Sequence, residues 1–497
     1  MASEKKVLLI RPENIYSYNN YPPLNLISIG TSLKKAGFEV DIVNCARERE
    51  PLNLITQKAK DAAFIGITMV TSECCGAYNV ISRVKSHLKT PVVVGGWHCT
   101  LFPEQMMENN LIDYVVVGEG EEAIFDIYSQ IGDDGNSHNK LYGGRKINLD
   151  NLPLPEYDLD YRIEEFMTSY LTDRFVAFEP KPPRWLPYES SRGCPSRCTF
   201  CINTVTKNNV YRKKSAAKVI DELGYIVKKY NINHVKFIDD NFFVDINRSR
   251  EIAEGIMAMK LSITWDAECR CDYFNGRMLN DDTLELFKRS GLVQLTLGIE
   301  SGSQKTLDIL KKDIDVEQSK YTVMKCDEHK IIARSSFMIE VPGETIYDIR
   351  ETIKLINYLR KYKYFSCGVT AFRPYPKCEL TQGLLQKGFL VEPKSFEEWG
   401  IKQNMELYTS CEHNKPWQVH PSYSESAAYF LNIESEVRLG QHQIKSRFLK
   451  LINAIFVRMA KTRNRLGLYQ LSLDKYLYKI FLTSFYKLQQ KSEKLKK

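Results

Sequence analysis

The sequence lacks a long apolar run, although 43% of its 497 residues are hydrophobic. No stretch approaches the about 20 consecutive apolar residues that a membrane-spanning helix needs. The N-terminal MASEKKVLLIRP passes directly from a charged lead into an apolar, strand-like run, without the longer apolar region and cleavage site of a signal peptide. We therefore expect a cytoplasmic globular protein of two or three domains.

A disulfide framework is missing as well. The 13 cysteines are an odd number without regular spacing, which fits a reducing compartment where thiols stay free or bind metal. Three of them lie close together and need their own explanation. The other ten are interpreted as small buried or half-buried hydrophobic residues: Cys45, Cys74, Cys75, Cys99, Cys269, Cys271, Cys326, Cys367, Cys378 and Cys411.

Acidic residues are scarce near the C-terminus. Residues 441–497 contain 14 Lys or Arg and 2 Asp or Glu, a local charge of +12, so the preceding residues carry 8 − 12 = −4. Apolar residues recur there at helical spacing. We expect a helical region over 391–497 that caps the preceding domain. An alternative is peripheral attachment to the anionic inner face of a membrane, and nucleic acid is the least favoured partner.

Residues 1–145 alternate apolar runs with helical stretches. This order predicts a doubly wound, Rossmann-like parallel sheet. Ligands of such sheets bind at the carboxyl ends of the strands, where glycine lets a backbone approach closely. The five expected strands are VLLIRP, FEVDIVN, AFIGITMV, PVVVGG and YVVVGEG.

A proline-bearing segment, NLDNLPLPEYDLDY, predicts a linker over 146–185. The alternation then resumes over 186–390, with strand-like runs such as HVKFIDD, VQLTLGIES and SCGVTAF separated by helical segments. This pattern predicts a second α/β domain, most simply a partial TIM-type barrel with its working loops at the strand ends.

Cys194, Cys198 and Cys201 have the spacing C-x3-C-x2-C. Thiolates favour soft metals and iron-sulfur clusters. A structural zinc site needs four protein ligands, and the candidates for a fourth, His234 and Cys269, are distant in sequence. A 4Fe-4S cluster held by three thiolates keeps one iron open for a substrate or cofactor. We favour the cluster over zinc with a remote ligand and over a chance grouping of three thiols.

This loop, with Phe200 just before its last cysteine, resembles the cluster-binding loop of the radical S-adenosylmethionine (SAM) superfamily, and the resemblance continues in order along 186–385. It implies that the three cysteines bind a 4Fe-4S cluster whose open iron is chelated by SAM. One-electron reduction, by a donor such as flavodoxin or ferredoxin, then cleaves SAM to a 5′-deoxyadenosyl radical.

The resemblance also assigns residues to SAM. Asp239 and Asp240, in FIDDNF, match groups that meet the methionyl amine, for which two acceptors would suit an ammonium; the alternative is helix capping. Glu300 and Ser301, in LGIESGS, match contacts to the ribose and methionyl part, with a buried salt-bridged glutamate as the alternative.

Two further candidates are less specific. Arg270, in WDAECRCD, could meet the methionyl carboxylate or equally be a surface or ion-pair arginine. Tyr375, in FRPYPKCEL, falls in a strand-end loop that the resemblance places near the adenine, where the alternative role is to shape the loop.

The first domain resembles the cobalamin-binding domain that precedes one branch of radical SAM enzymes. The matching stretches are YPPLNLISIGTSLKKAG, GGWHCTLFPE and VVVGEGEEA. The D-x-H-x-x-G motif that supplies a lower histidine ligand to cobalt is absent, and His98 is only a weak alternative. The resemblance assigns cobalamin contacts to Thr71, Ser72, Gly95, Gly96, Gly118, Glu119 and Gly120.

Taken together, these features predict a cobalamin-dependent radical SAM enzyme. We expect a methyltransferase acting on an unactivated carbon of a small-molecule, natural-product or lipid-like substrate. The enzymatic alternative is a radical cyclisation or rearrangement without methyl transfer, and the non-enzymatic alternative is a cobalamin or iron-sulfur sensor. A tRNA methylthiotransferase is disfavoured, because that group has a different first domain with three cluster cysteines of its own.

Overall fold

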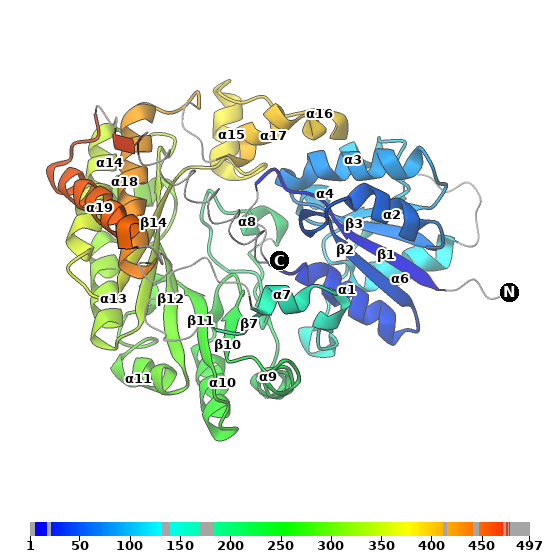
Figure 1. Ribbon diagram of the computed structural model, residues 1–497, viewed down its shortest axis with the longest axis horizontal. Coiled ribbons are helices and arrows are strands. Elements are labelled where there is room, and N and C mark those ends of the chain that lie inside the picture. Colours follow the sequence, from blue (N-terminus) through cyan, green and yellow to red (C-terminus); the bar gives the residue numbers. More distant parts are fainter. Residues whose placement is uncertain are drawn as a thin grey trace.

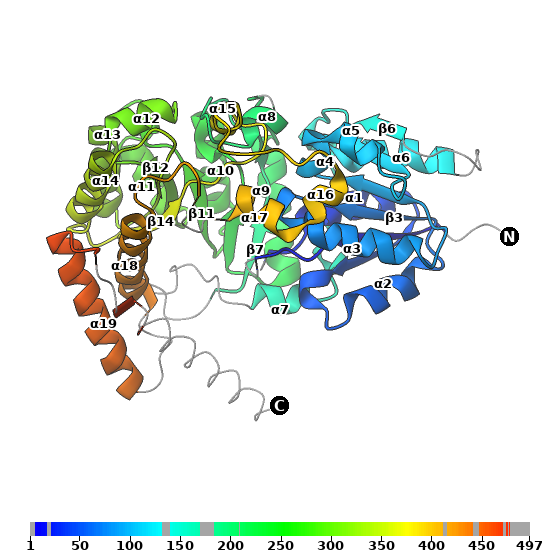
Figure 2. The same ribbon diagram turned by 90° about the horizontal axis from the view of Figure 1, so that it is seen from above.

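The computed structural model describes residues 5–16, 21–131, 140–168, 183–207, 209–410, 415–440, 447–470, 474, 475 and 477. Two six-stranded sheets, both parallel throughout, dominate the fold and lie side by side (Figures 1 and 2). Among the described residues, no helix combines the length and the apolar character required to cross a bilayer.

The first sheet confirms the predicted doubly wound domain. Its strand order is β2-β1-β3-β4-β5-β6. Apolar residues that alternate along the strands serve both faces: Leu9 of β1 packs with α1 and α6, whereas Leu8 and Ile10 pack with α2 and α3 (Figure 1). The strands are β1 (Lys6–Arg11), β2 (Glu39–Asn44), β3 (Phe64–Thr68), β4 (Val92–Gly95), β5 (Tyr114–Val117) and β6 (Lys140–Gly143). The helices are α1 (Leu24–Lys35), α2 (Pro51–Ala59), α3 (Cys74–Lys85), α4 (Trp97–Leu101), α5 (Pro103–Met107) and α6 (Gly120–Ile131).

The sequence predicted five of these six strands and missed β6. Among the described strands, β6 pairs with β5 alone, at the edge of the sheet, and its sequence KLYG contains no apolar run. Leu141, its most apolar residue, is 49% exposed. A four-residue edge strand with an exposed leucine carries little of the signal by which buried parallel strands are recognised.

The second sheet has the order β14-β13-β12-β11-β10-β7, so each strand lies next to its neighbour in the chain. This sequential parallel order, with helices between the strands, confirms the partial barrel. The strands are β7 (Trp185–Tyr188), β10 (His234–Phe237), β11 (Thr264–Cys269), β12 (Leu292–Glu300), β13 (Ile332–Ile339) and β14 (Phe365–Ala371). The connecting helices are α9 (Ala216–Tyr230), α10 (Ile246–Ala258), α11 (Asp281–Arg289), α12 (Gln304–Ile309), α13 (Val316–Glu328) and α14 (Ile346–Leu359). A small antiparallel pair, β8 (Ser191–Arg192) and β9 (Arg212–Lys213), flanks the cysteine loop.

The two faces of the second sheet differ in chemistry. Alternate residues, such as Phe237, Trp265 and Ala267, belong to the apolar core under the helices. Many of the intervening residues are polar, and they face the inside of the barrel. The strand register places three of them, Glu268, Thr296 and Arg334, in one row across β11, β12 and β13. The inner face is therefore a polar surface.

The linker contains three short elements, η3 (Leu149–Asn151), η4 (Tyr157–Leu159) and α7 (Ile163–Met167). Of these, η4 and α7 contact β7 of the second sheet. The hydroxyl of Tyr157 donates to the carbonyl of Pro187 in β7 at 2.6 Å. The rest of the predicted linker includes residues 169–182, which lie outside the described residues.

The C-terminal region is helical, as predicted, but it covers two places. Trp399 of α16 packs against Phe102 in the first domain, whereas α18 and α19 lie beside β14 and α14. The helices of this region are α16 (Phe396–Gly400), α17 (Lys402–Thr409), α18 (Pro421–Gly440) and α19 (Arg447–Leu466), and α15 (Glu379–Gln386) precedes them. Most of the predicted basic tail beyond residue 470 lies outside the described residues.

Candidate active site

The cysteine loop begins at a glycine that no other residue could replace without strain. Gly193 follows β8 with a φ of +86°, and a Cβ at this position would lie 1.9 Å from the carbonyl oxygen of Val210. The loop then passes through the three cysteines to the short helix α8 (Asn203–Thr206). The amide of Thr199, inside the loop, donates to the carbonyl of Leu310 at 3.0 Å and ties the loop to the segment after α12.

Two side chains direct N–H groups at the cysteine sulfurs. Asn241 Nδ2 lies 3.5 Å from Cys194 Sγ, and Arg270 Nη1 lies 3.8 Å from Cys198 Sγ. Burial raises the pKa of Cys201 to about 11. N–H donors and a guanidinium stabilise sulfur that carries negative charge, and metal coordination requires deprotonated thiols. The loop is thus suited to hold thiolates once they are coordinated.

The zinc alternative with His234 as the fourth ligand is wrong. His234 begins β10, at the opposite end of the strand from the cysteine loop. Both of its ring nitrogens are already engaged, with Thr264 Oγ1 at 2.9 Å and Asp266 Oδ2 at 2.9 Å. Within the described part of the chain, no three Cys, His, Asp or Glu side chains converge on a single metal ion. This finding concerns one ion and not a cluster, in which each thiolate binds a different iron.

Asp239 and Asp240 lie beside the cysteine loop, where they brace it. Asp239 is fully buried and accepts hydrogen bonds from the amide of Ser190 at 2.7 Å and from the hydroxyl of Ser191 at 2.6 Å. Asp240 accepts from the amide of Gly193 at 2.8 Å and forms an ion pair with Lys207 at 2.6 Å. The capping alternative is wrong, because Asp245 caps the following helix, α10.

Glu300 ends β12 and lies next to a cation that the sequence reasoning missed. Lys312 Nζ is 3.2 Å from Glu300 Oε1 and 5.9 Å from the ring centroid of Phe200. Both charged side chains are about nine-tenths buried. Neighbouring Gly298 leaves the space they occupy, since its Cβ would lie 2.5 Å from Lys312 Nζ. Lys312 lies 12 residues after the end of the strand and belongs to no recognisable motif. Only the folded path of the loop brings it next to Glu300.

Arg270 and Ser301 are engaged within the protein. The guanidinium of Arg270 pairs with Asp272 at 2.9 Å and donates to the carbonyl of Lys312 at 2.6 Å. The hydroxyl of Ser301 is fully buried and lies 2.9 Å from Thr352 Oγ1. Both side chains therefore hold the strand-end loops in place, which for Arg270 corresponds to the predicted ion-pair alternative.

Tyr375 lies in the turn between β14 and α15. Its carbonyl accepts a hydrogen bond from the amide of Cys378 at 3.4 Å. This contact belongs to the backbone of the turn and fits the loop-shaping alternative. Of the ten cysteines predicted to be inert, the nine that the structure describes are free thiols that are buried or, for Cys75, half-buried, whereas Cys411 lies outside the described residues.

A cavity of about 630 Å³ separates the carboxyl ends of the first sheet from the cysteine loop. It contains five of the seven residues predicted to contact cobalamin: Gly95, Gly96, Gly118, Glu119 and Gly120. From the second domain, Glu189, Arg192 and Lys207 complete the wall. At Gly96, where φ is +99°, a Cβ would lie 2.6 Å from the carbonyl of Met69.

Thr71 and Ser72 do not line this cavity. The flanking residues Val70 and Glu73 do line it, whereas Ser72 Oγ accepts a hydrogen bond from Asn14 at 2.8 Å. Thr71 Oγ1 lies 3.3 Å from His98 Nδ1. These contacts stabilise the loop that follows β3. The predicted cobalamin contact of Thr71 and Ser72 has no support in the lining of the cavity.

His98 also does not line the cavity, although its neighbour Trp97 does. Its ring is fully buried and packs against Phe102 and Trp399, with centroids 5.0 and 5.1 Å away. Burial lowers its pKa to about 3, so the imidazole is neutral at physiological pH. The described residues that line the cavity include no histidine. His98 therefore packs in the core as a neutral ring, and its weak candidacy as a cobalt ligand gains no support.

One arginine connects the two domains across the cavity. Arg192, two residues before Cys194, pairs with Glu121 at 2.7 Å, with Glu189 at 2.8 Å and with Glu119 at 3.3 Å. Burial acts to raise the pKa of Glu121, but Arg192 outweighs this effect and holds that pKa below its usual value. The cysteine loop is thereby tied to the start of α6, which borders the glycine-lined wall.

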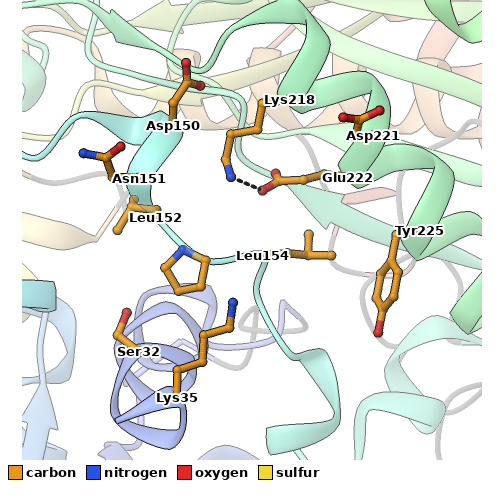
Figure 3. Close-up of a pocket in the computed structure, with 11 residues that line it drawn as sticks. Ser32, Lys35, Asp150, Asn151, Leu152, Leu154, Lys218, Asp221, Glu222 and Tyr225 are labelled. Carbon is orange, nitrogen blue, oxygen red and sulfur yellow. Dashed lines mark ion pairs between the residues drawn. The ribbon is translucent and has the colours of Figure 1, made fainter.

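A second hollow lies behind the linker and contains none of the predicted site residues. It has a volume of about 630 Å³ and shares Leu152 and Pro153 with the first cavity. Figure 3 shows Lys218 and Glu222 pointing toward each other from α9, with Ser32 and Lys35 of α1 on the opposite side. Within this lining Lys218 pairs with Glu222 at 3.0 Å, and Glu222 also binds Lys214 at 2.6 Å.

Two family models match the chain in the places that the fold suggests. The B12 binding domain matches residues 14–127, and the radical SAM superfamily matches residues 188–356. The chain is therefore a radical SAM enzyme that carries a B12-binding domain. Its cofactors are accordingly SAM, a 4Fe-4S cluster and cobalamin.

Relatives of this chain are named either as methyltransferases or as cyclases. An uncharacterized methyltransferase of Pyrococcus horikoshii is 28% identical over 409 residues, covering 78% of this chain and 84% of the relative. The anaerobic magnesium-protoporphyrin IX monomethyl ester cyclase of Rubrivivax gelatinosus is 25% identical over 418 residues, covering 80% and 72%. The cobalamin-dependent SAM radical enzyme OxsB, solved with aqua-cobalamin and SAM, shares the fold with a TM-score of 0.69 at 16% identity, covering 98% of this chain and 75% of OxsB.

Proposed function

We propose that this enzyme is a methyltransferase that acts on an unactivated carbon of a small molecule. The observation that carries the proposal is the single cavity bordered by glycine turns of the B12-binding domain on one side and by residues flanking the cysteine loop on the other. A methyl carrier and a radical generator could then serve the same substrate. The relative from Pyrococcus horikoshii, named as a methyltransferase, supports this interpretation.

The residues present fit the groups that the family implies. Cys194, Cys198 and Cys201 would hold the cluster in a loop with N–H donors aimed at sulfur. Gly95 and Gly96 border the cavity where cobalamin would bind, and at Gly96 a side chain could not be accommodated. When bound, the cluster and SAM supply a carbon radical that abstracts hydrogen, and cobalamin supplies the methyl group.

We further propose that Lys312, and not Arg270, provides the cation for the methionyl carboxylate. Arg270 already pairs with Asp272 and the backbone of Lys312. Among the described residues, Lys312 has one ion-pair partner, Glu300, and its ammonium lies near Phe200 in the cysteine loop. Glu300 would accept from the ribose or the amine. Asp239 and Asp240 would then act indirectly, by fixing the loop through Ser190 and Gly193.

The direct test of methylation uses SAM with a deuterated methyl group. With the substrate identified, the expected result is a product carrying the label. The main alternative, a cyclisation or rearrangement without methyl transfer, gains support from the relative named as a cyclase. That activity predicts 5′-deoxyadenosine together with an unlabelled product, a result that would refute methylation.

The remaining assignments complete the proposal. The electron donor is expected to be a flavodoxin or ferredoxin, and the location cytoplasmic. The substrate is a small molecule, with a natural product or a lipid-like compound as the two narrower classes. We propose the domain division 1–145, 146–185, 186–390 and 391–497; the last strand of the first sheet, β6, ends at Gly143 and so agrees with the first boundary.

A further inference from the structure

We infer that the outward face of α19 docks this enzyme on the surface of a membrane that contains anionic lipid. This helix lies at the end of the molecule away from the first sheet (Figure 2). This surface is separate from the cavity and is not needed for the proposed reaction.

The inward face of α19 is set by buried polar contacts. Asn464 is 1% exposed, and its Nδ2 donates to Glu434 Oε2 at 2.9 Å and to the carbonyl of Phe430 at 3.1 Å, both in α18. Asn357 of α14 donates to the carbonyl of Asn464 at 2.9 Å. Val457 and Ala460, on the same side, are 5% and 0% exposed. The helix cannot rotate without breaking these contacts, so its opposite face is held outward.

That outward face carries an apolar stripe. Leu451, Ile455, Met459 and Leu466 are 62%, 53%, 39% and 61% exposed. With about 100° per residue, the four side chains fall within an arc of about 80°, and they extend over about 22 Å of helix. The exposed Thr462 falls within the same arc, between Met459 and Leu466. Isolated exposed apolar residues are common, but four that gather on one face of a helix mark an interaction surface.

A basic stripe lies directly beside the apolar one. Arg458, Lys461 and Arg465 are exposed and fall within the adjoining arc of about 60°. Residues 447–470 contain no Asp or Glu. Long cationic side chains beside an apolar stripe can reach lipid phosphates while the apolar side chains enter the headgroup boundary. This charge complementarity favours an anionic lipid surface over an apolar protein groove.

The experiment is vesicle flotation of the full-length enzyme, with phosphatidylcholine vesicles and with vesicles that also contain phosphatidylglycerol. We expect binding to the anionic vesicles that weakens with salt. The charge variant Arg458→Gln/Lys461→Gln/Arg465→Gln should reduce the partition coefficient on the order of 100-fold, since each cation contributes about 1 kcal/mol near the surface. The stripe variant Leu451→Ser/Ile455→Ser/Met459→Ser/Leu466→Ser should reduce it at least about 10-fold.

Two matched control variants replace exposed residues outside α19. The apolar control is Met259→Ser/Tyr347→Ser/Val391→Ser/Val419→Ser, at positions 46%, 72%, 75% and 58% exposed. The charge control is Arg277→Gln/Lys354→Gln/Lys402→Gln, in exposed side chains. Both controls should float like the parent enzyme, and unchanged thermal midpoints show that all variants are folded.

Three outcomes would overturn the inference. The first is the absence of flotation with anionic vesicles at low salt. The second is flotation that the stripe variant leaves unchanged, which would indicate nonspecific attraction by the basic tail. The third is a dimer, detected by light scattering, that the stripe variant dissociates while vesicle binding is absent; the stripe would then be a contact between two copies of this chain.

Discussion

The two six-stranded sheets differ in what covers their faces. The first sheet is packed on both faces by helices, and its strands are apolar on both sides. The second sheet has one apolar face under its helices and one polar inner face with a row formed by Glu268, Thr296 and Arg334. A ligand can approach the first sheet only at its edge, through glycine turns, whereas the inner face of the second sheet is itself available for chemistry.

This difference explains why the carboxyl ends of the strands are built differently in the two sheets. These ends are called the first edge and the second edge. At the first sheet, Gly96 borders the cavity without a side chain, and a Cβ there would collide with the backbone of Met69. At the second sheet, side chains crowd the edge and brace one another, as Asp239 does with Ser190 and as Lys312 does with Glu300. Added bulk at a glycine is therefore expected to harm both edges, as at Gly96 and Gly193, whereas only the second edge depends as well on braced side-chain pairs.

The largest effect is expected from removing a cluster ligand at the second edge. Cys198→Ala should reduce iron content and abolish cleavage of SAM to 5′-deoxyadenosine, because the proposed cluster would lose one of its three protein ligands. Cobalamin binding should persist, since it depends on the other edge. Iron, sulfide and cobalt counts after anaerobic purification check both statements. The matched control Cys75→Ala, at a half-buried thiol of the first domain, should leave the iron content unchanged. Full turnover by Cys198→Ala would contradict the site.

The next effect separates the two edges by adding one methyl group to each. Gly193→Ala would place a Cβ 1.9 Å from the carbonyl of Val210 and should cost at least about 1–3 kcal/mol of strain in the cysteine loop. Gly96→Ala would place one 2.6 Å from the carbonyl of Met69. We expect the first variant to lose iron but keep cobalamin, and the second to lose cobalamin but keep iron.

A third glycine provides the control for this pair. Gly276 has a φ of +76°, but no atom lies within 4 Å of the position that a Cβ would occupy there. Gly276→Ala should therefore cost only the strain of the left-handed backbone, about 1–2 kcal/mol, and retain both cofactors. If Gly193→Ala and Gly96→Ala lost the same cofactor, the distinction between the two edges would fail. Metal analysis and the visible spectrum report the result.

A smaller effect is expected at the braced cation of the second edge. Lys312→Met removes the ammonium proposed to meet the methionyl carboxylate and should raise the KM for SAM about 10- to 100-fold, the range of a charge-assisted hydrogen bond. The neighbouring Lys311 pairs with Glu379 in an exposed position and serves as the matched control. Lys311→Met should leave the KM unchanged. An equal response of the two variants, measured as formation of 5′-deoxyadenosine against SAM concentration, would refute the assignment.

The sequence predicted those parts of the site whose residues are contiguous. The cysteine loop and the glycine turns each lie within one short segment, so their order in the chain already reflects their geometry. Lys312 could not be predicted, because its role depends on a loop that returns to Glu300. The bracing role of Asp239 depends on Ser190, 49 residues earlier. Strand β6 was missed for a different reason, since an exposed edge strand needs no apolar run.

The smallest effect concerns the polar inner face of the second sheet and depends on pH. Burial raises the pKa of Glu268 to about 7 from its usual 4.5, with a smaller contribution from Asp266. The folded state therefore holds a proton on Glu268 between these two pH values, whereas the unfolded state releases it. The free energy of unfolding should therefore fall as the pH rises from about 4.5 to about 7, by about 1–2 kcal/mol after allowance for solvent screening of this half-buried side chain. Glu268→Gln should remove that slope in urea unfolding curves recorded across this range. If the free energy of unfolding kept the same pH dependence in the variant, the inner face of the second sheet would not penalise charge at this position. The contrast between the two sheets would then rest only on the carboxyl ends of their strands.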